Sequence, residues 1–411
     1  MNILLINHYA GNPILGMSFR PYYLSREWIK QGHSVTIAGG SFSHLRYRQP
    51  EITKDFTTDI IDGVNYVWLK TPSYPNSGLK RFISMLVFVF KLFWYRKRFV
   101  KLFNPDVVIA SSTYPLDIFP SRSIAKKSNA KLCFELHDLW PLSPMLIGGF
   151  SKWHPFIMLM QAGENYACRQ SDVIVSLLDN AKAHLMKHGM TAEKFHCVPN
   201  GFVMSEYVER ENIPEKHEKI IGELKQQNKL LVGYAGGFNP STAMHILVEA
   251  AKKLSSNQNL AFVCVGKGPE CKSLNKLVKD NNLDNFFILE PVNKKAVSTF
   301  LREMDILYSG SKKSEIEKHG ISPNKLVDYM LSVKPVVLSR DLVVDNLTTK
   351  LSCGITVPAE DADAVANAIE KLISYTEQER MEMGQRGFKY AYNNLNYETL
   401  SQKFIEILIN S

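Results

Sequence analysis

The sequence has few groups that could cross-link it or hold a metal, because its six cysteines in 411 residues include no C-x-x-C pair. Cys133, Cys197 and Cys264 lie within apolar runs that are typical of strands. We therefore expect buried thiols in a reducing compartment rather than disulfides or zinc ligands. The first residues also lack the basic segment and cleavage site of a secretory signal. These absences disfavour a secreted disulfide scaffold.

Acidic residues are absent from the segment 79–103, in which seven residues are Lys or Arg. The net charge of the whole chain is +9, so this segment supplies most of it and the remainder is nearly neutral. A nucleic-acid-binding surface needs basic residues spread along a groove or a face. We therefore expect no nucleic acid among the partners.

The same segment lacks the length of a membrane span. Its apolar run before Lys91 covers 82–90, whereas crossing a bilayer takes about 20 apolar residues. Aromatic side chains beside cations are typical of a segment that lies in the headgroup region of an anionic leaflet. We therefore predict an anionic membrane surface as a partner of 79–103; the alternative is a buried helix. The aromatic residues assigned to this surface are Phe82, Phe88, Phe90, Phe93 and Trp94.

The chain does have the composition of a folded core, with 45% apolar and 22% charged residues. Its length predicts two domains of about 200 residues each. Short β-branched runs alternate with amphipathic ones, stop in the polar stretch 206–229 and then begin again, which indicates two parallel sheets covered on both faces. The expected strands are 3–6, 34–38, 65–69, 106–110, 131–136, 172–176, 196–199, 230–234, 261–265, 285–289, 305–308, 335–338 and 354–357. We predict an α/β protein of two Rossmann-like domains facing across a cleft, with ligands beyond the carboxyl ends of the strands.

A strong helix start in the second half is the first candidate binding site. Ser322 suits the N-cap and Pro323 the first turn, and the free N–H groups at a helix start suit a diphosphate. Gly320 would let the backbone approach the ligand. Lys325 would then meet phosphate, while Asp328 would accept hydrogen bonds from ribose hydroxyls. The alternative is a capped surface helix with an ion pair between these two side chains.

Two glycine loops follow strands of the second half. Gly236 and Gly237 lie between an expected strand and helix, where such a turn forms an anion site or a plain tight turn. The run 265–271 is similar to a dinucleotide fingerprint but lacks the third glycine and follows the wrong strand. We therefore do not expect a nicotinamide cofactor.

In the first half, Gly16 lies in the loop after the opening strand and is a candidate donor-binding residue, and Arg20 should lie on the first helix. His137 and Asp138 end another expected strand, beside Trp140. We predict that His137 and Asp138 are catalytic residues, together with Lys325, since the carboxyl ends of parallel strands line the site. The alternative for His137 is a structural role.

These pieces together resemble the retaining GT-B glycosyltransferases of family 4 over nearly the whole chain. The matching segments are Gly32 to Thr36, Pro105 to Val108, His137-Asp138, Ser171 to Val175, Val198 to Phe202 and Gly320 to Pro335. The resemblance implies a first domain of 1–205 that binds the acceptor, completed by a C-terminal helix at 390–411. It implies that residues 206–389 bind the nucleotide sugar and that the reaction needs no metal or other cofactor. We add Pro291, Val292, Ile321 and Asn324 to the donor-binding candidates.

Two departures from the family pattern affect the donor site. The family's two acids stand eight positions apart, but here Gly320 occupies the position of the first, with Glu317 nearby and out of register. Residues 238–241 replace the arginine and lysine that usually meet the diphosphate. The phosphate charge would then be met by Lys325 and by backbone N–H groups.

A front-face retaining transfer tolerates a missing acid, because the departing phosphate oxygen can take the proton of the acceptor hydroxyl. The resemblance extends to transferases of bacterial O-antigen and capsule assembly, including those that handle N-acetylfucosamine. We therefore predict a peripheral enzyme at the inner face of the cell membrane. It would transfer a sugar, from a UDP-sugar by preference, to a lipid-linked (polyprenyl diphosphate) saccharide. The alternatives are a sugar-nucleotide epimerase of similar fold and a non-enzymatic membrane-associated scaffold.

Overall fold

The computed structural model describes all residues except 17–18, 75–77, 321, 323 and 342–346. The contacts divide the chain into two units. Unit 1 comprises Met1–Asn200, His319–Ser322 and Tyr397–Ser411, and unit 2 comprises Gly201–Lys318 and Pro323–Asn396. Each unit is a Rossmann-like α/β sheet, so the predicted fold class is confirmed for both.

The sheet of unit 1 has the strand order β3-β4-β2-β1-β5-β6-β7-β8, and every neighbouring pair except β3 and β4 is parallel. Its central strands are buried apolar runs, as expected of strands that are covered by helices on both faces. The strands are β1 (Asn2–Ile6), β2 (Ser34–Gly40), β3 (Thr57–Ile61), β4 (Val64–Leu69), β5 (Val107–Ala110), β6 (Lys131–Leu136), β7 (Val173–Ser176) and β8 (Phe195–Cys197).

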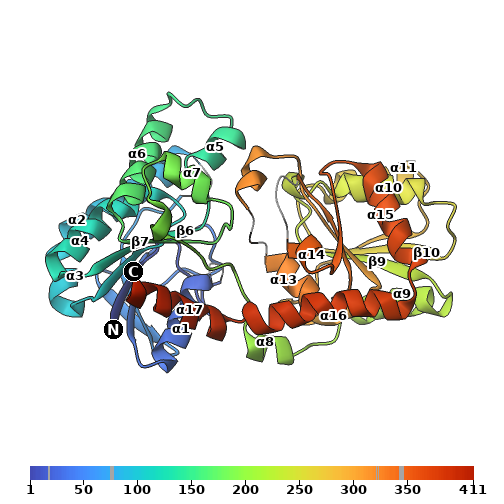
Figure 1. Cartoon of the computed structure of the whole chain (residues 1–411), viewed down its shortest axis with the longest axis horizontal. Coiled ribbons are helices and arrows are strands. Elements are labelled where there is room, and N and C mark those ends of the chain that lie inside the picture. The colour runs from blue at the N-terminus through green and yellow to red at the C-terminus, as the bar shows by residue number, and fades with distance from the viewer. Residues whose placement is uncertain (17–18, 75–77, 321, 323, 342–346) are drawn as a thin grey trace. The chain divides into compact units, whose positions relative to one another are not determined.

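The helices of unit 1 cover this sheet, and the last helix of the chain is one of them. Trp28 Nε1 donates a hydrogen bond to the carbonyl of Ser401 (3.1 Å), and its ring meets Phe404 edge to face. The C-terminal helix α17 therefore packs along α1 (Figure 1). The helices are α1 (Arg20–Lys30), α2 (Leu79–Trp94), α3 (Arg96–Phe103), α4 (Ile118–Ser128), α5 (Leu142–Leu146), α6 (Pro155–Gln170), α7 (Lys182–Lys187) and α17 (Tyr397–Asn410), with 3-10 turns at Pro115–Asp117 and Ala192–Lys194.

The sheet of unit 2 is parallel throughout and has the order β11-β10-β9-β12-β13-β14. Buried side chains fill both of its faces. The strands are β9 (Leu230–Ala235), β10 (Leu260–Val265), β11 (Phe286–Leu289), β12 (Ile306–Gly310), β13 (Val336–Ser339) and β14 (Gly354–Val357). The helices are α8 (Met204–Val208), α9 (Glu215–Gln226), α10 (Met244–Lys253), α11 (Cys271–Asp280), α12 (Lys294–Arg302), α13 (Asn324–Leu331), α14 (Leu347–Lys350), α15 (Ala362–Ser374) and α16 (Glu377–Asn394), with 3-10 turns at Pro240–Thr242 and Glu315–His319.

The sequence prediction missed strand β3, an edge strand that pairs antiparallel with β4. Its residues are mostly exposed and include two threonines and an aspartate, so they lack the apolar signal of the central strands. The connection is a tight turn in which Asp62 and Gly63 both have positive φ (49° and 80°). An Asp-Gly pair is typical of a hairpin turn, so this pair was the sequence signal from which the hairpin could have been predicted.

The basic segment 79–103 forms two helices, α2 and α3, which meet at Tyr95. One face of α2 is buried and holds Ser84, Met85, Phe88 and Leu92. Phe88 was predicted to lie on the exposed surface; this is wrong, because its ring is fully buried and stacks on His8 at 4.6 Å between centroids. The opposite face stays exposed and holds Leu79, Ile83, Leu86, Phe90, Phe93 and Trp94. Within the described parts of the chain, no helix combines the length and apolarity needed to cross a bilayer.

Candidate functional site

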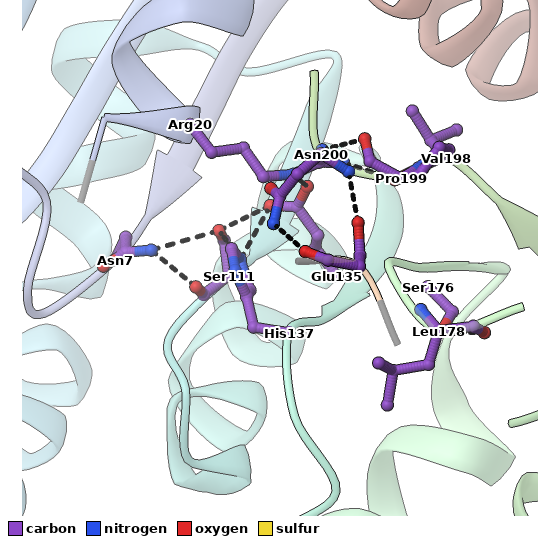
Figure 2. Close-up of polar contacts among 11 residues, drawn as sticks. Asn7, Arg20, Ser111, Glu135, His137, Ser176, Leu178, Val198, Pro199 and Asn200 are labelled. Atoms are coloured by element: carbon purple, nitrogen blue, oxygen red, sulfur yellow. Dashed lines mark hydrogen bonds and ion pairs between the residues drawn. The ribbon is translucent and has the colours of Figure 1, made fainter. Parts of the chain in front are cut away.

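The carboxyl ends of four strands in unit 1 bring polar side chains to one edge of the sheet. Asn7 follows β1, Ser111 follows β5, His137 follows β6, and Val198 follows β8. Glu135 lies inside β6, one residue before its end. Figure 2 shows these residues converging, with Arg20 of α1 reaching in from the side. This is the edge at which open parallel sheets bind their ligands.

Glu135 is the centre of this cluster. Its side chain has no exposed surface, and its Oε1 accepts from Arg20 Nε at 2.9 Å. Its Oε2 accepts from Ser111 Oγ at 2.6 Å and lies 3.2 Å from His137 Nε2. Burial alone would raise the pKa of Glu135, but the charge of Arg20 and the hydrogen bonds from His137 and Ser111 outweigh it and hold the pKa well below the usual range. Glu135 is therefore a buried carboxylate that stays ionised.

Arg20 connects this carboxylate to the loop after β8. Its two terminal nitrogens donate to the carbonyls of Pro199 (2.6 Å) and Val198 (2.9 Å), while Nε bonds Glu135. A guanidinium has five donors in a fixed plane, so one side chain can serve three acceptors in this way. Arg20 therefore holds the loop 198–200 against the end of β6 (Figure 2).

The tautomer of His137 follows from its partners. Ser111 has one hydroxyl hydrogen, which it donates to Glu135, so its oxygen can only accept at the 3.0 Å contact with His137 Nε2. Nε2 therefore carries hydrogen, and in the neutral ring Nδ1 holds the lone pair. The His137 side chain is 17% exposed, so part of it is accessible from solvent.

Asp138 and Gly16 make local contacts in unit 1. Asp138 Oδ1 accepts from Ser143 Oγ (2.6 Å) and from the N–H of Leu139 (2.8 Å), which ties it to the start of α5. Gly16 has φ of 96°, and a β-carbon there would run into the Tyr47 ring. Neither residue contacts Glu135 or His137 by a hydrogen bond that the structure records.

In unit 2, the fold brings Lys325 to the Gly236-Gly237 turn, although 88 positions separate Lys325 from Gly237. Lys325 Nζ donates to Tyr234 Oη at 2.7 Å and lies 4.1 Å from the centroid of that ring. Tyr234 Oη in turn donates to the carbonyl of Gly237 at 2.8 Å. A β-carbon at Gly236 would lie only 2.8 Å from Lys325 Nζ, so the glycine makes room for the amine. Burial, with a smaller contribution from Arg340, lowers the pKa of Lys325 to about 8.

The glycines of the run 265–271 pack against this turn rather than forming a dinucleotide fingerprint. A β-carbon at Gly266 would collide with the carbonyl oxygen of Gly236, and one at Gly268 with the backbone of Phe238. The N–H of Phe238 donates to the carbonyl of Lys267 at 3.0 Å, which joins the two loops. The glycine spacing thus has a packing cause.

Lys325 and Asp328 share α13, but Lys325 bonds Tyr234 and not Asp328 in the described part of the chain. Asp328 is exposed, as is Asn324 at the start of the helix. Pro291 is exposed and Val292 half-buried in the loop after β11.

Ser322 and Gly320, which precede α13, make their contacts within unit 1. Ser322 Oγ and the Ser322 carbonyl accept from the backbone N–H (2.7 Å) and side chain (3.0 Å) of Asn200. Gly320 is buried with φ of 94°, and a β-carbon there would run into Asp179. The predicted donor residue Ile321 and the expected first-turn residue Pro323 lie outside the described residues.

Glu317, the acid that is out of register, has a partner that sequence reasoning did not find. Its Oε1 accepts from Arg340 (2.9 Å) and its Oε2 from Ser311 Oγ (2.9 Å). Burial raises the pKa of this carboxyl despite the nearby guanidinium. Sequence reasoning also missed the central place of Glu135. An acid inside the buried run 131–136 was the available signal, because buried acids are rare unless they are paired.

Comparison with known proteins agrees with this architecture. The family described as Glycosyltransferase Family 4 matches residues 16–206, and the family described as Glycosyl transferases group 1 matches residues 215–390. The protein is therefore an enzyme, a glycosyltransferase, and not the epimerase or the scaffold considered as alternatives. It belongs to the GT-B glycosyltransferases of the group 1 and family 4 type. No curated protein matched the sequence.

Solved structures share the fold at low identity. Sucrose-phosphate synthase from Thermosynechococcus elongatus is 15% identical with a TM-score of 0.70, and the match covers 98% of this chain and 97% of that one. HepE from Anabaena in complex with UDP-glucose is 16% identical with a TM-score of 0.63, over 100% of both chains. A trehalose-6-phosphate structure from E. coli with UDP-2-fluoro glucose is 11% identical with a TM-score of 0.72, over 100% of this chain and 99% of that one. At these identities the likeness shows the fold.

Proposed function

We propose that this glycosyltransferase uses a UDP-sugar as donor and transfers the sugar with retention to a lipid-linked saccharide at an anionic membrane surface. Two of the solved structures with this fold hold UDP-glucose or a fluorinated analogue, which supports uridine as the base. The proposed setting is the inner face of a bacterial cell membrane, in synthesis of a surface polysaccharide such as O-antigen. N-acetylfucosamine is the first donor sugar to test.

The proposed diphosphate site is the Gly236-Gly237 turn with Lys325. The amine already lies against the turn, where the absence of a side chain on Gly236 gives it room, and a diphosphate bound to the backbone N–H groups of the turn would meet it there. A diphosphate would replace Tyr234 as the partner of Lys325 and keep the lysine charged, since an opposite charge favours the charged form. Asp328 would accept hydrogen bonds from the ribose, and Asn324, Pro291 and Val292 would border the nucleotide.

His137 is the proposed contact to the transferred sugar. Its Nε2 is held by Ser111 and Glu135, so its Nδ1 is free to accept a hydrogen bond from a sugar hydroxyl. In a front-face transfer the leaving phosphate oxygen takes the proton of the acceptor, so the protein must mainly stabilise the departing diphosphate. Lys325 and the turn amides would supply that stabilisation, while the ionised Glu135 keeps His137 in one orientation.

The exposed apolar face of α2 is the observation that carries the proposed acceptor class. Phe90, Phe93 and Trp94 are 64%, 45% and 68% exposed on one face of the helix, which a soluble surface seldom tolerates in a cluster. The Arg96 guanidinium lies 4.4 Å from the Phe93 ring centroid, so a cation borders the apolar row. A lipid-linked acceptor cannot leave the bilayer, and this face would hold the enzyme beside it.

Sedimentation with liposomes tests the membrane part of the proposal. Wild-type protein should bind vesicles that contain about 30% phosphatidylglycerol, which carry a negative surface charge. It should release them as the salt concentration rises. Replacing the exposed Lys80, Lys97 and Lys101 by glutamate should abolish binding, whereas replacing the exposed Lys126 and Lys127 on α4 should not. Failure of the wild type to bind at low salt, or equal loss in both variants, would refute the membrane role and favour a soluble acceptor.

Donor specificity requires a separate measurement. A ligand that binds only the native state raises the unfolding temperature, so UDP-, GDP- and dTDP-sugars can be ranked by thermal shift. The proposal expects the largest shift with a UDP-sugar, and loss of that shift in Lys325→Met. Equal shifts with all three bases would contradict the uridine assignment.

A further inference from the structure

A cluster of possible metal ligands lies in unit 1 and includes none of the residues of the proposed transfer chemistry. Glu164 on α6, His184 on α7 and His188 at the end of α7 place one ligand atom each within 4.8 Å of one another. Figure 1 shows α6 and α7 in the same part of the unit. The Glu164 side chain is 1% exposed, and the two imidazoles are 12% and 24% exposed. A carboxylate is seldom buried so completely without a cation to pair with.

The hydrogen bonds around His188 fix its tautomer. Gln161 has two amide hydrogens, and these are donated to Glu164 Oε2 (2.8 Å) and Asn165 Oδ1 (2.9 Å). Gln161 Nε2 also lies 3.0 Å from His188 Nδ1 but has no hydrogen left to give it. His188 Nδ1 must therefore donate to Asn165 Oδ1 at 2.8 Å, which leaves the lone pair of the neutral ring on Nε2.

The lone pair on His188 Nε2 lies near the carboxylate of Glu164, whose oxygens also offer lone pairs. His188 Nε2 lies 3.8 Å from Glu164 Oε2, which is too long for a hydrogen bond. His184 Nε2 lies 2.9 Å from Glu164 Oε1 on the other side of the same carboxylate. Two zinc ligands at about 2.0 to 2.1 Å from the metal and at a tetrahedral angle lie about 3.3 Å apart. The two observed distances run to different carboxylate oxygens, and the 2.9 Å contact is a hydrogen bond, so zinc binding requires His184 Nε2 to lose its hydrogen and the side chains to shift.

The surroundings of the cluster are those of a metal site. Histidine ligands commonly donate their other ring N–H to an oxygen acceptor, as His188 does to Asn165. The ring of His319 packs edge to face against His184, 5.1 Å between centroids, and restrains its orientation.

We propose that Glu164, His184 and His188 bind one Zn²⁺ ion, with water as the fourth ligand. The ligand set of two imidazoles and one carboxylate suits zinc better than magnesium, which prefers oxygen ligands in octahedral geometry. The role is structural, because the ion cross-links the long helix α6 to the short helix α7. None of the three ligands belongs to the proposed transfer chemistry, so the site does not conflict with a reaction that needs no metal.

Zinc titration of the full-length, chelator-treated protein tests this site. Competition with a chromophoric chelator should show one tight Zn²⁺ site per chain, and Zn²⁺ but not Mg²⁺ should raise the unfolding temperature. His184→Ala and His188→Ala should each weaken Zn²⁺ binding at least about 10-fold. Asn165→Ala, which removes only the acceptor for His188 Nδ1, should weaken it by about 10-fold.

Two further variants keep the test independent of folding defects. Glu164→Gln preserves the shape of the side chain and should still weaken binding. His196→Ala removes a half-buried histidine of the same unit outside the cluster and should bind Zn²⁺ as the wild type does. The proposal is overturned if the wild type binds no stoichiometric Zn²⁺, if Glu164→Gln, His184→Ala and His188→Ala all keep wild-type affinity, or if His196→Ala loses as much as they do.

Discussion

The buried carboxylate of Glu135 leads to a quantitative prediction for Glu135→Gln. The substitution removes the charge that compensates Arg20, whose side chain is 5% exposed. Breaking a buried ion pair from one side costs about 3 to 5 kcal/mol, and the amide oxygen of glutamine can retain one hydrogen bond to Arg20, worth about 1 kcal/mol. We therefore expect unit 1 to lose about 2 to 4 kcal/mol of stability.

The assay can isolate unit 1, because all five tryptophans of the chain (Trp28, Trp68, Trp94, Trp140 and Trp153) lie in it. Urea unfolding followed by tryptophan fluorescence then reports on this unit alone. A loss below about 1 kcal/mol would refute the reasoning. Arg20→Met combined with Glu135→Gln should cost less than the sum of the two single changes, since each single change leaves a charge unpaired.

The stability difference between the wild type and Glu135→Gln should depend on pH, and the sign of that dependence follows from the pKa of Glu135. The folded pKa of Glu135 lies below its unfolded value, so its contribution is present above the unfolded pKa of about 4.3. It is lost as the pH falls through the folded pKa. The stability difference between wild type and Glu135→Gln should therefore be constant above about pH 5 and shrink below about pH 4. A difference that stays unchanged down to pH 3 would contradict a depressed pKa.

Three other predictions concern binding, turnover and packing. The pKa of Lys325 is about 8 in the free protein, so UDP affinity measured by calorimetry should fall as the pH rises through that value. Lys325→Met should bind UDP weakly and without this pH dependence. A wild-type affinity that is flat from about pH 7 to 9 would contradict the role of Lys325. His137→Gln should lower kcat more than it raises KM for the donor, and an unchanged kcat would remove His137 from the site. Gly266→Ala should destabilise unit 2 by more than about 2 kcal/mol, the cost of a severe backbone clash. Gly222→Ala on α9 is the control and should not destabilise it, because a β-carbon there meets open space. Equal effects of the two substitutions in thermal unfolding would contradict the packing argument.

The parallel strands were predictable because their signal is local. A strand that is buried on both faces is a short run of apolar residues, as 230–235 and 260–265 are. The edge strand β3 has one polar, exposed face, and its existence depends on pairing with β4. The buried and exposed faces of α2 were also beyond the sequence, because apolar residues lie all around that helix.

The candidate site was predictable at the level of loops but not of partners. The end of an expected strand indicated His137, and the start of an expected helix indicated Lys325. Each of these signals is contained in a few neighbouring residues of the sequence. Their partners depend on contacts across the fold. Tyr234 is 91 positions from Lys325 and Arg20 is 115 positions from Glu135, and no local pattern encodes such a pairing. The same holds for Arg340, which takes the carboxylate of Glu317.

The place of α17 in unit 1 has a consequence for synthesis of the protein on the ribosome. Unit 1 begins with the first residue, yet it includes Tyr397–Ser411 at the very end of the chain. While translation continues, the apolar side of α1, including Trp28, has no helix α17 to cover it. Domains generally fold in the order in which they are made, but here the first domain is finished last. Unit 2 is complete in sequence at Asn396, before the helix that covers Trp28 has been made, so the surface of α1 that α17 covers stays open for longer than any surface of unit 2.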